Sequence, residues 1–182
     1  MGMSDYIKLP IDVTFGGHNL TTIEGMSLMG SWTVAVRASN NRVYLIGNGA
    51  SAATASHYGA DAMKQLGVKT HVLHDPAYMT AAANDFGYDK SFSWQLLRYL
   101  DREDMLIAIS GSGESENIVS ALEAAKYCHV HRIVTLTGKR ADNRVRKLGV
   151  LNWYVPSSNY GPIEAAHWTI LHKYWIDGGV PC

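Results

Sequence analysis

The stretch 43-VYLIGNGASAATASHYGAD-61 holds the clearest structural signal in this chain of 182 residues. A short apolar run, residues 43–46, ends in Gly47-Asn48-Gly49, and a segment of small residues follows. This pattern predicts a buried strand, a tight turn and then a helix. Because a helix N-terminus carries unpaired N–H groups and a positive partial charge, the turn suits a phosphate, and Ser51 adds a hydroxyl.

Two ionisable side chains follow in the same predicted helix. His57 and Asp61 are four residues apart, so both project from one face. An imidazole beside a carboxylate can carry acid–base chemistry or bind a metal ion. One element would therefore hold an anion at its start and offer reactive groups further along.

Composition and charge narrow the class of protein. With 47% hydrophobic and 18% charged residues, the chain can bury one sizeable core and is expected to form a single domain. It contains no run of 18 apolar residues, which argues against a membrane span, and residues 1–15 lack the pattern of a signal peptide. Sixteen basic residues balance sixteen acidic ones, which argues against a nucleic-acid partner. Two cysteines give no disulfide framework, so we expect a cytoplasmic enzyme or binding protein.

The remaining sequence alternates between apolar runs and helical periodicity. Residues 1–20 are expected to be an irregular lead-in, and residues 21–182 the folded domain. Predicted strands lie at 43–46, 69–73, 105–109, 132–136 and 151–155. Predicted helices lie at about 21–38, in pieces over 77–100, at 117–127 and at about 162–176. The alternation predicts a parallel sheet with helices on both faces.

A second glycine- and serine-rich loop, Ser110-Gly111-Ser112-Gly113-Glu114-Ser115, directly follows the strand 105–109. Its hydroxyls and backbone N–H groups can form a compact set of donors for three phosphate oxygens. The first loop alone fits only a weak dinucleotide pattern, because Asp75 lies too late to bind a ribose. Either loop alone could be an ordinary turn, with Ser115 as a helix cap. Two such loops at strand ends of one sheet favour a phosphate site.

Four segments together resemble a known family, over residues from about 42 to about 176. The segments are IGNGASA, NDFGYD, ISGSGESENI and EAAHWTILH. They resemble the sugar isomerase (SIS) domain and, within it, the phosphoheptose isomerases, which make heptose for lipopolysaccharide or capsule. The resemblance implies a flavodoxin-like, five-stranded parallel sheet, a sugar-phosphate ligand without a nucleotide cofactor, and a homotetramer with active sites between subunits.

The resemblance also implies roles for individual residues. Phosphate would be held by the turn serine and the serine-rich loop, with the loop glycines allowing close approach. These positions are Gly49, Ser51, Ser110, Gly111, Ser112 and Ser115. Asn48 and Asp85 match positions near the sugar.

The family's chemistry is aldose–ketose isomerisation through an enediol, here of sedoheptulose 7-phosphate to D-glycero-D-manno-heptose 7-phosphate. By resemblance Asp61 is the base and His172 the acid. The family pattern has Glu where this chain has Asp61, and Gln where it has Glu164. Some family members bind zinc with these positions, so His57, Asp61, Glu164 and His172 are the expected ligands of a divalent metal, zinc first.

Two other functions stay open. A non-catalytic sugar-phosphate sensor or protein-binding adaptor on the same fold is favoured by the shortened Asp61 and opposed by the retained His172. A dinucleotide-binding oxidoreductase is weaker, because no cofactor motif follows the second strand. His167 is expected to be structural, and the basic segment 139–147 to be a solvated helix face.

Overall fold

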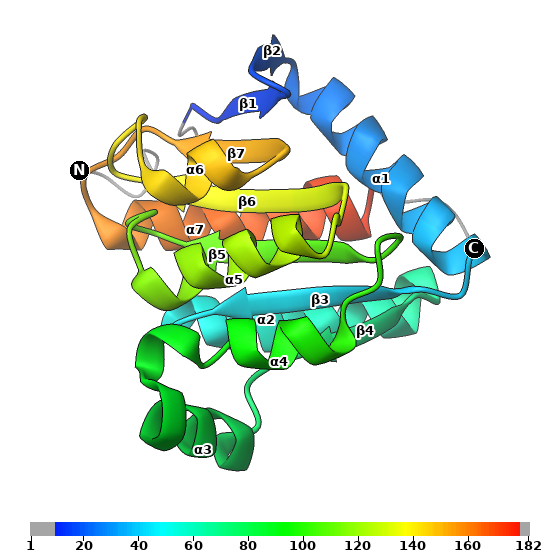
Figure 1. The fold of residues 1–182 in the computed structure, drawn as a ribbon. Coiled ribbons are helices and arrows are strands. Elements are labelled where there is room, and N and C mark those ends of the chain that lie inside the picture. Colours follow the sequence, from blue (N-terminus) through cyan, green and yellow to red (C-terminus); the bar gives the residue numbers. More distant parts are fainter. Residues whose placement is uncertain (1–9, 179–182) are drawn as a thin grey trace.

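A computed structural model describes residues 10–178 of the chain (Figure 1). The apolar run 43–46 lies in β3 (Arg42–Gly47), an inner strand of the sheet. Within those residues the sheet has seven strands. The others are β1 (Asp12–Phe15), β2 (His18–Leu20), β4 (Lys69–Val72), β5 (Met105–Ser110), β6 (Arg132–Gly138) and β7 (Leu151–Val155). All five strands predicted from the sequence are present.

The five predicted strands are parallel and adjacent in the order β4-β3-β5-β6-β7. Numbered along the chain, this is the order 2-1-3-4-5, which is the flavodoxin-like arrangement. The predicted fold class is therefore confirmed. The strand order reverses between β3 and β5, and ligands in such sheets bind outside the carboxyl ends of the strands at this point.

Helices cover both faces of the sheet. Successive residues of a strand point to opposite faces, so each inner strand contributes to a core on either side. Val43 and Leu45 pack with one core cluster, whereas Tyr44 and Ile46 pack with the other. The first face is covered by α1 (Thr22–Ala38), α2 (Ala50–Asp61) and α7 (Tyr160–Thr169), and the second by α3 (Pro76–Phe86), α4 (Ser93–Tyr99), α5 (Glu116–Tyr127) and α6 (Arg144–Leu148). No helix within residues 10–178 is both long and apolar enough to cross a membrane.

Two helices continue in an unusual form. After Asp61, α2 runs on as the π-helical segment η2 (Ala62–Leu66). The last helix starts at Tyr160, two residues before the predicted Pro162, and continues as the π-helical segment η4 (Ile170–Ile176). Such wider turns are uncommon and often occur at functional sites.

The expected irregular lead-in is wrong for residues 12–20, which form the antiparallel hairpin β1–β2, and the five-strand count is corrected to seven. Gly16 and Gly17 both have positive φ, at 54° and 88°, and make the two-residue turn. The hairpin extends the sheet because β1 pairs antiparallel with β7. Residues 1–9 of the predicted lead-in lie outside the described residues.

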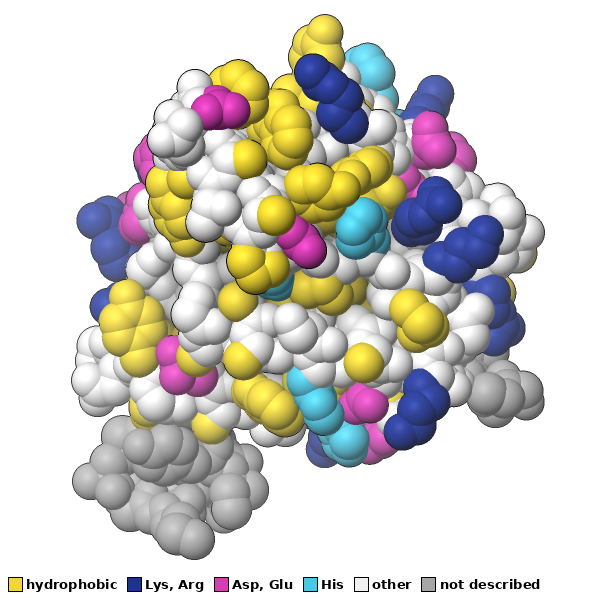
Figure 2. Space-filling model, turned by 90° about the horizontal axis from the view of Figure 1, so that it is seen from below, with side chains coloured by type: hydrophobic (Ala, Val, Ile, Leu, Met, Phe, Trp, Pro, Cys, Tyr) yellow, Lys and Arg dark blue, Asp and Glu magenta, His cyan; other side chains and the backbone are white. Residues whose placement is uncertain are grey.

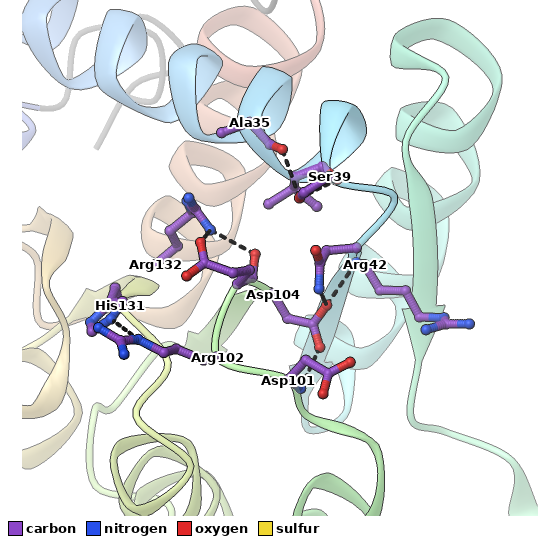
Figure 3. Close-up of polar contacts among 11 residues, drawn as sticks. Ala35, Ser39, Arg42, Asp101, Arg102, Asp104, His131 and Arg132 are labelled. Carbon is purple, nitrogen blue, oxygen red and sulfur yellow. Dashed lines mark hydrogen bonds and ion pairs between the residues drawn. The ribbon is translucent and has the colours of Figure 1, made fainter.

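A buried carboxylate organises the amino ends of the strands, opposite the predicted ligand edge (Figure 3). Asp104 is fully buried and accepts hydrogen bonds from the backbone N–H groups of Arg42, at 2.8 Å, and Asp101, at 2.7 Å. It therefore joins the start of β3 to the turn before β5.

Candidate functional site

The two predicted phosphate loops meet at one cavity. β3 and β5 are neighbours, and the loops after both strands lie at the same edge of the sheet. The cavity has a volume of about 130 Å³. Its lining residues are Asn48, Ser51, Ile109, Ser110, Gly111, Ser112, Ser115, Tyr160 and Glu164. Most of the expected phosphate-binding residues are therefore brought together at the switch point of the sheet.

The first loop depends on two glycines and an amide pair. A Cβ on Gly47 would lie 2.6 Å from the carbonyl oxygen of Ser51, and Gly49 has a φ of 56°. Both positions therefore disfavour a larger residue. Asn48 Nδ2 donates to Asn117 Oδ1 at 2.8 Å, and Asn117 Nδ2 donates back to Asn48 Oδ1 at 2.9 Å. Tyr88 Oη also donates to Asn48 Oδ1, at 2.9 Å, so the orientation of the Asn48 amide is fixed.

The serines of the second loop bond within the loop, and Ser110 Oγ donates a long hydrogen bond to Ser115 Oγ at 3.5 Å. Ser110 Oγ accepts from the Gly113 N–H at 3.2 Å, and Ser112 Oγ accepts from the Glu114 N–H at 3.2 Å. A hydroxyl that accepts from the backbone can still donate its own proton. Gly113 has a φ of 68°, and a Cβ there would overlap the side chain of Asn143. The serines thus lie on a tightly constrained turn.

The helices that start at this cavity lack side-chain caps. Within the described range, 10–178, no side-chain hydrogen bond caps the first turn of α2, α5 or α7. By contrast, side chains cap α1, α3 and α6, whose caps are Thr21, Asp75 and Asn143. Ser51, Ser115 and Tyr160 at the uncapped starts all line the cavity. An uncapped N-terminus leaves N–H donors for an anion, and the helix dipole adds a positive potential.

The two expected sugar contacts differ in position. Asn48 lines the cavity, as the sequence predicts. Asp85 is exposed near the end of α3, where Asn84 Nδ2 donates to its carboxylate at 2.8 Å, and it is not among the cavity-lining residues. In a single chain Asp85 therefore does not contribute to the cavity wall.

The predicted acid–base groups lie on α2 and η4. His57 Nε2 is 3.2 Å from Asp61 Oδ2, and the Asp61 side chain is 17% exposed. The ring of His57 stacks on Trp168 with centroids 4.8 Å apart. Tyr58 donates from its hydroxyl to the Trp168 carbonyl at 3.0 Å, and burial, then the charge of Asp61, raises the pKa of Tyr58 to about 12. His172 packs near Tyr58, with ring centroids 6.2 Å apart.

Comparisons with known proteins agree with this geometry. Residues 21–138 match the model of the SIS domain. The chain belongs to the SIS domain family. It is 33% identical over 150 residues to the phosphoheptose isomerase of Geobacter sp. (strain M21). This alignment covers 78% of this chain and 76% of the relative.

Solved structures show the same relationship. The phosphoheptose isomerase GmhA from Neisseria gonorrhoeae superimposes with a TM-score of 0.78 at 27% identity, over 84% of each chain. A phosphoheptose isomerase from Francisella tularensis gives a TM-score of 0.78 at 26% identity, over 85% of this chain and 84% of the other. The resemblance found in the sequence is therefore confirmed, and with it a phosphoheptose isomerase-like enzyme at the level of the family.

The four expected metal ligands do not come together within a single chain, as far as its described residues show. Among residues 10–178, no group of three or more His, Cys, Asp or Glu side chains is placed to hold a metal ion. Glu164, Trp168 and His172 are spaced four apart, and the Trp168 ring packs on His57. Within residues 10–178, His57 and Asp61 are the only two of the four that contact each other.

His167 is structural, as expected. It is 1% exposed, and its Nε2 lies 3.3 Å from the carbonyl oxygen of Thr137. A carbonyl can only accept, so Nε2 carries the proton. Burial lowers the pKa of His167 to about 4, against a smaller opposing effect of this hydrogen bond. The His167 imidazole is therefore neutral at physiological pH.

Sequence reasoning missed several residues at the site. Asn117 and Tyr88 fix Asn48, and Tyr160 forms part of the cavity wall. Tyr160 could have been found, because it follows the last strand of the SIS domain and so lies at the ligand-binding edge. The amide pair of Asn48 and Asn117 joins residues 69 positions apart, and no local pattern reports such a contact.

Proposed function

We propose that this protein is a sugar-phosphate aldose–ketose isomerase that converts sedoheptulose 7-phosphate to D-glycero-D-manno-heptose 7-phosphate. The observation that carries the proposal is the cavity where three uncapped helix N-termini meet two glycine-containing loops, which carry four serines between them. Such a set of donors suits the phosphate group of a substrate. The names of the relatives supply the substrate class.

Binding begins with the phosphate. Ser51, Ser110, Ser112 and Ser115 supply hydroxyl donors, and the two glycine turns allow the backbone to approach the ligand. Asn48, held by Asn117 and Tyr88, contacts the sugar beyond the phosphate. Because this amide is already oriented in the free protein, little conformational freedom is lost on binding.

Proton transfer completes the reaction. The Asp61 carboxylate removes a proton from C1, the electrons of the broken C–H bond form the C1–C2 double bond, and the carbonyl electrons move to O2, which takes the proton of the C1 hydroxyl. The negative charge then left on O1 re-forms a carbonyl at C1, and the electrons of the C1–C2 double bond take a proton from His172 at C2, which gives the aldose. His57 orients the Asp61 carboxylate through their 3.2 Å contact. The π-helical segments η2 and η4 begin directly after Asp61 and contain His172, in line with a functional role for both positions.

We place the active sites between subunits of a homotetramer. Ser51 and Asp61 are ten residues apart in α2, which separates their Cα atoms by about 15 Å. Six carbon–carbon bonds of about 1.5 Å limit a heptose chain to about 9 Å. A sugar held by the phosphate loops of one chain is therefore better placed for catalytic groups from a partner. His172 is also 56% exposed, and a partner would shield it.

Exposed apolar side chains support assembly. Figure 2 shows hydrophobic side chains spread over the face on the side of α3. Large apolar side chains exposed on α3 and α4 include Tyr78 at 47%, Phe86 at 53% and Leu97 at 44%. Single exposed apolar residues are ordinary, but a group of them is typical of an interface.

The divalent metal and the cytoplasmic location expected from the sequence stay predictions. When bound, a divalent ion would polarise the substrate carbonyl. Since its expected ligands do not converge in one chain, the proposed steps use only Asp61, His57 and His172.

The direct test is to incubate the pure protein with sedoheptulose 7-phosphate, with and without zinc, and to follow the aldose product. Conversion that depends on His172 supports the isomerase. Binding without conversion in either condition would reject it and favour the sugar-phosphate sensor.

A further inference from the structure

Among residues 10–178, the side chains that line the cavity include no cation that could balance a phosphate. Its lining residues are neutral except for Glu164, which is acidic. A phosphate dianion would therefore meet hydroxyls and N–H groups together with a carboxylate of its own sign. Charge-assisted contacts are stronger than neutral ones, so a nearby cation would improve such a site considerably.

Lys139 is held beside this edge by an unusual backbone. It directly follows β6, next to the strand that leads into the serine-rich loop. Its φ is 56°, in the left-handed region that residues other than glycine seldom adopt. The Lys139 N–H donates to the Ser157 carbonyl at 3.0 Å, and Tyr154 Oη donates to the Lys139 carbonyl at 3.0 Å. Costly backbone geometry that is fixed on both sides is typical of functional positions.

The Lys139 side chain ends at the cavity wall. Its Nζ lies 3.7 Å from the centroid of the Tyr160 ring. Tyr160 lines the cavity, and a Cβ on Gly111 would lie 3.1 Å from the edge of that ring. The ammonium is thus separated from the phosphate loops by a single aromatic ring.

Lys139 differs from the basic residues that follow it. Arg140 pairs with Asp142 at 2.9 Å, and Arg144 pairs with Glu116 at 2.6 Å. Lys139 forms no ion pair with a carboxylate among residues 10–178. Its contact with an exposed ring is weak enough to be exchanged for a phosphate oxygen. The expected helix face is wrong for residues 139–143, because α6 begins only at Arg144.

We propose that Lys139 is the cationic residue of the anion site and moves from the Tyr160 ring to the phosphate when a sugar phosphate binds. The inference rests on the proposed function for the identity of the ligand. The flexible four-carbon stem of lysine allows the movement, and its ammonium provides three donors.

Titration of inorganic phosphate into the full-length protein tests this role. We expect Lys139→Met to weaken phosphate binding about tenfold at low ionic strength, and Lys139→Arg to stay within about threefold of the wild type. The loss should shrink as salt is added, because salt screens the charge. Lys147→Met is the matched control, since it removes the same charge from an exposed helix position and should change affinity less than about twofold.

The outcomes separate the two proposals. Wild-type binding with equal affinity in Lys139→Met would overturn the role of Lys139 and leave the phosphate site intact. An equal loss in Lys139→Met and Lys147→Met would also overturn it, because net charge alone would then explain the effect. A wild-type protein that binds no phosphate at all would reject the phosphate site, and with it the proposed function. Thermal unfolding of each variant establishes that it is folded.

Discussion

Asp61 is the residue on which the proposed chemistry depends. Its carboxylate lies 3.2 Å from His57 and is mostly buried, at 17% exposed. The side chain is about 1.5 Å shorter than the Glu of the family pattern, which is one carbon–carbon bond. The contact with His57 fixes where the shorter carboxylate lies, so we infer that this site is built for Asp.

Changes of length and charge at this position test that inference. Asp61→Asn should lower kcat at least about a hundredfold, because an amide cannot accept the substrate proton. Asp61→Glu should lower kcat about tenfold or more, since displacing the carboxylate spoils its alignment. Phosphate affinity should stay within about twofold in both, because Asp61 does not line the cavity. A rise of kcat in Asp61→Glu would contradict the inference, because it would mean that the site is still shaped for the longer Glu side chain.

The amide pair of Asn48 and Asn117 is a second test at this scale. Asn117 is 2% exposed, and its loss removes both hydrogen bonds to Asn48. Asn117→Ala should therefore lower the free energy of unfolding by about 2 kcal/mol, measured by urea denaturation. Asn84→Ala, at an exposed amide, should cost less than about 0.5 kcal/mol. An equal loss of unfolding free energy in both variants would mean that the hydrogen bonds between Asn48 and Asn117 do not stabilise the fold.

At the scale of elements, the sequence predicted what local chemistry encodes. The five parallel strands are short apolar runs, and the loops after β3 and β5 carry glycines at positions where a Cβ would clash. The hairpin β1–β2 was missed because Gly16 and Gly17 were interpreted as breakers, although they form a two-residue turn. The π-helical segments η2 and η4 were missed because the sequence was compared only with the α-helical period of 3.6 residues, whereas the buried residues of η4 recur five apart, as in Ile170 and Trp175.

α7 also makes folding sensitive to acid. The pKa of His167 is lowered to about 4 in the folded protein, whereas an unfolded histidine titrates near 6.5. The unfolded state therefore binds more protons in this range, and stability falls as the pH falls from about 6.5 to about 4. The expected loss from this residue between about pH 7 and about pH 5 is about 2 kcal/mol.

Urea denaturation of the wild type and of His167→Gln at both pH values measures this contribution. The variant has no imidazole to protonate, so its stability should fall less than that of the wild type, by about the same 2 kcal/mol. The comparison cancels the carboxylates common to both proteins. Parallel pH profiles would show that His167 does not couple folding to protons.

At the scale of the whole molecule, one chain presents an incomplete site. The phosphate loops form a cavity, but Asp85 is not part of its wall, and His172 is exposed. The sequence predicted these residues individually through the family resemblance. In the proposed homotetramer their relative placement would depend on contacts between subunits, which no local sequence pattern describes.

Assembly is therefore expected to control activity. Sedimentation should give a mass of about four times the 20.0 kDa chain, and specific activity should fall on dilution below the dissociation constant of the tetramer. Phosphate binding should survive dilution, since one chain forms the cavity. A fully active monomer would contradict active sites that lie between subunits.

The central claim is isomerisation through an enediol with Asp61 as the base. The most direct test is to run the reaction on sedoheptulose 7-phosphate in D₂O and to follow the product by NMR. The proton returned by the acid exchanges with solvent, so we predict a heptose 7-phosphate that carries deuterium at C2, and none of this product with Asp61→Asn. Failure of the wild type to convert the substrate, or a product without deuterium, would contradict the account.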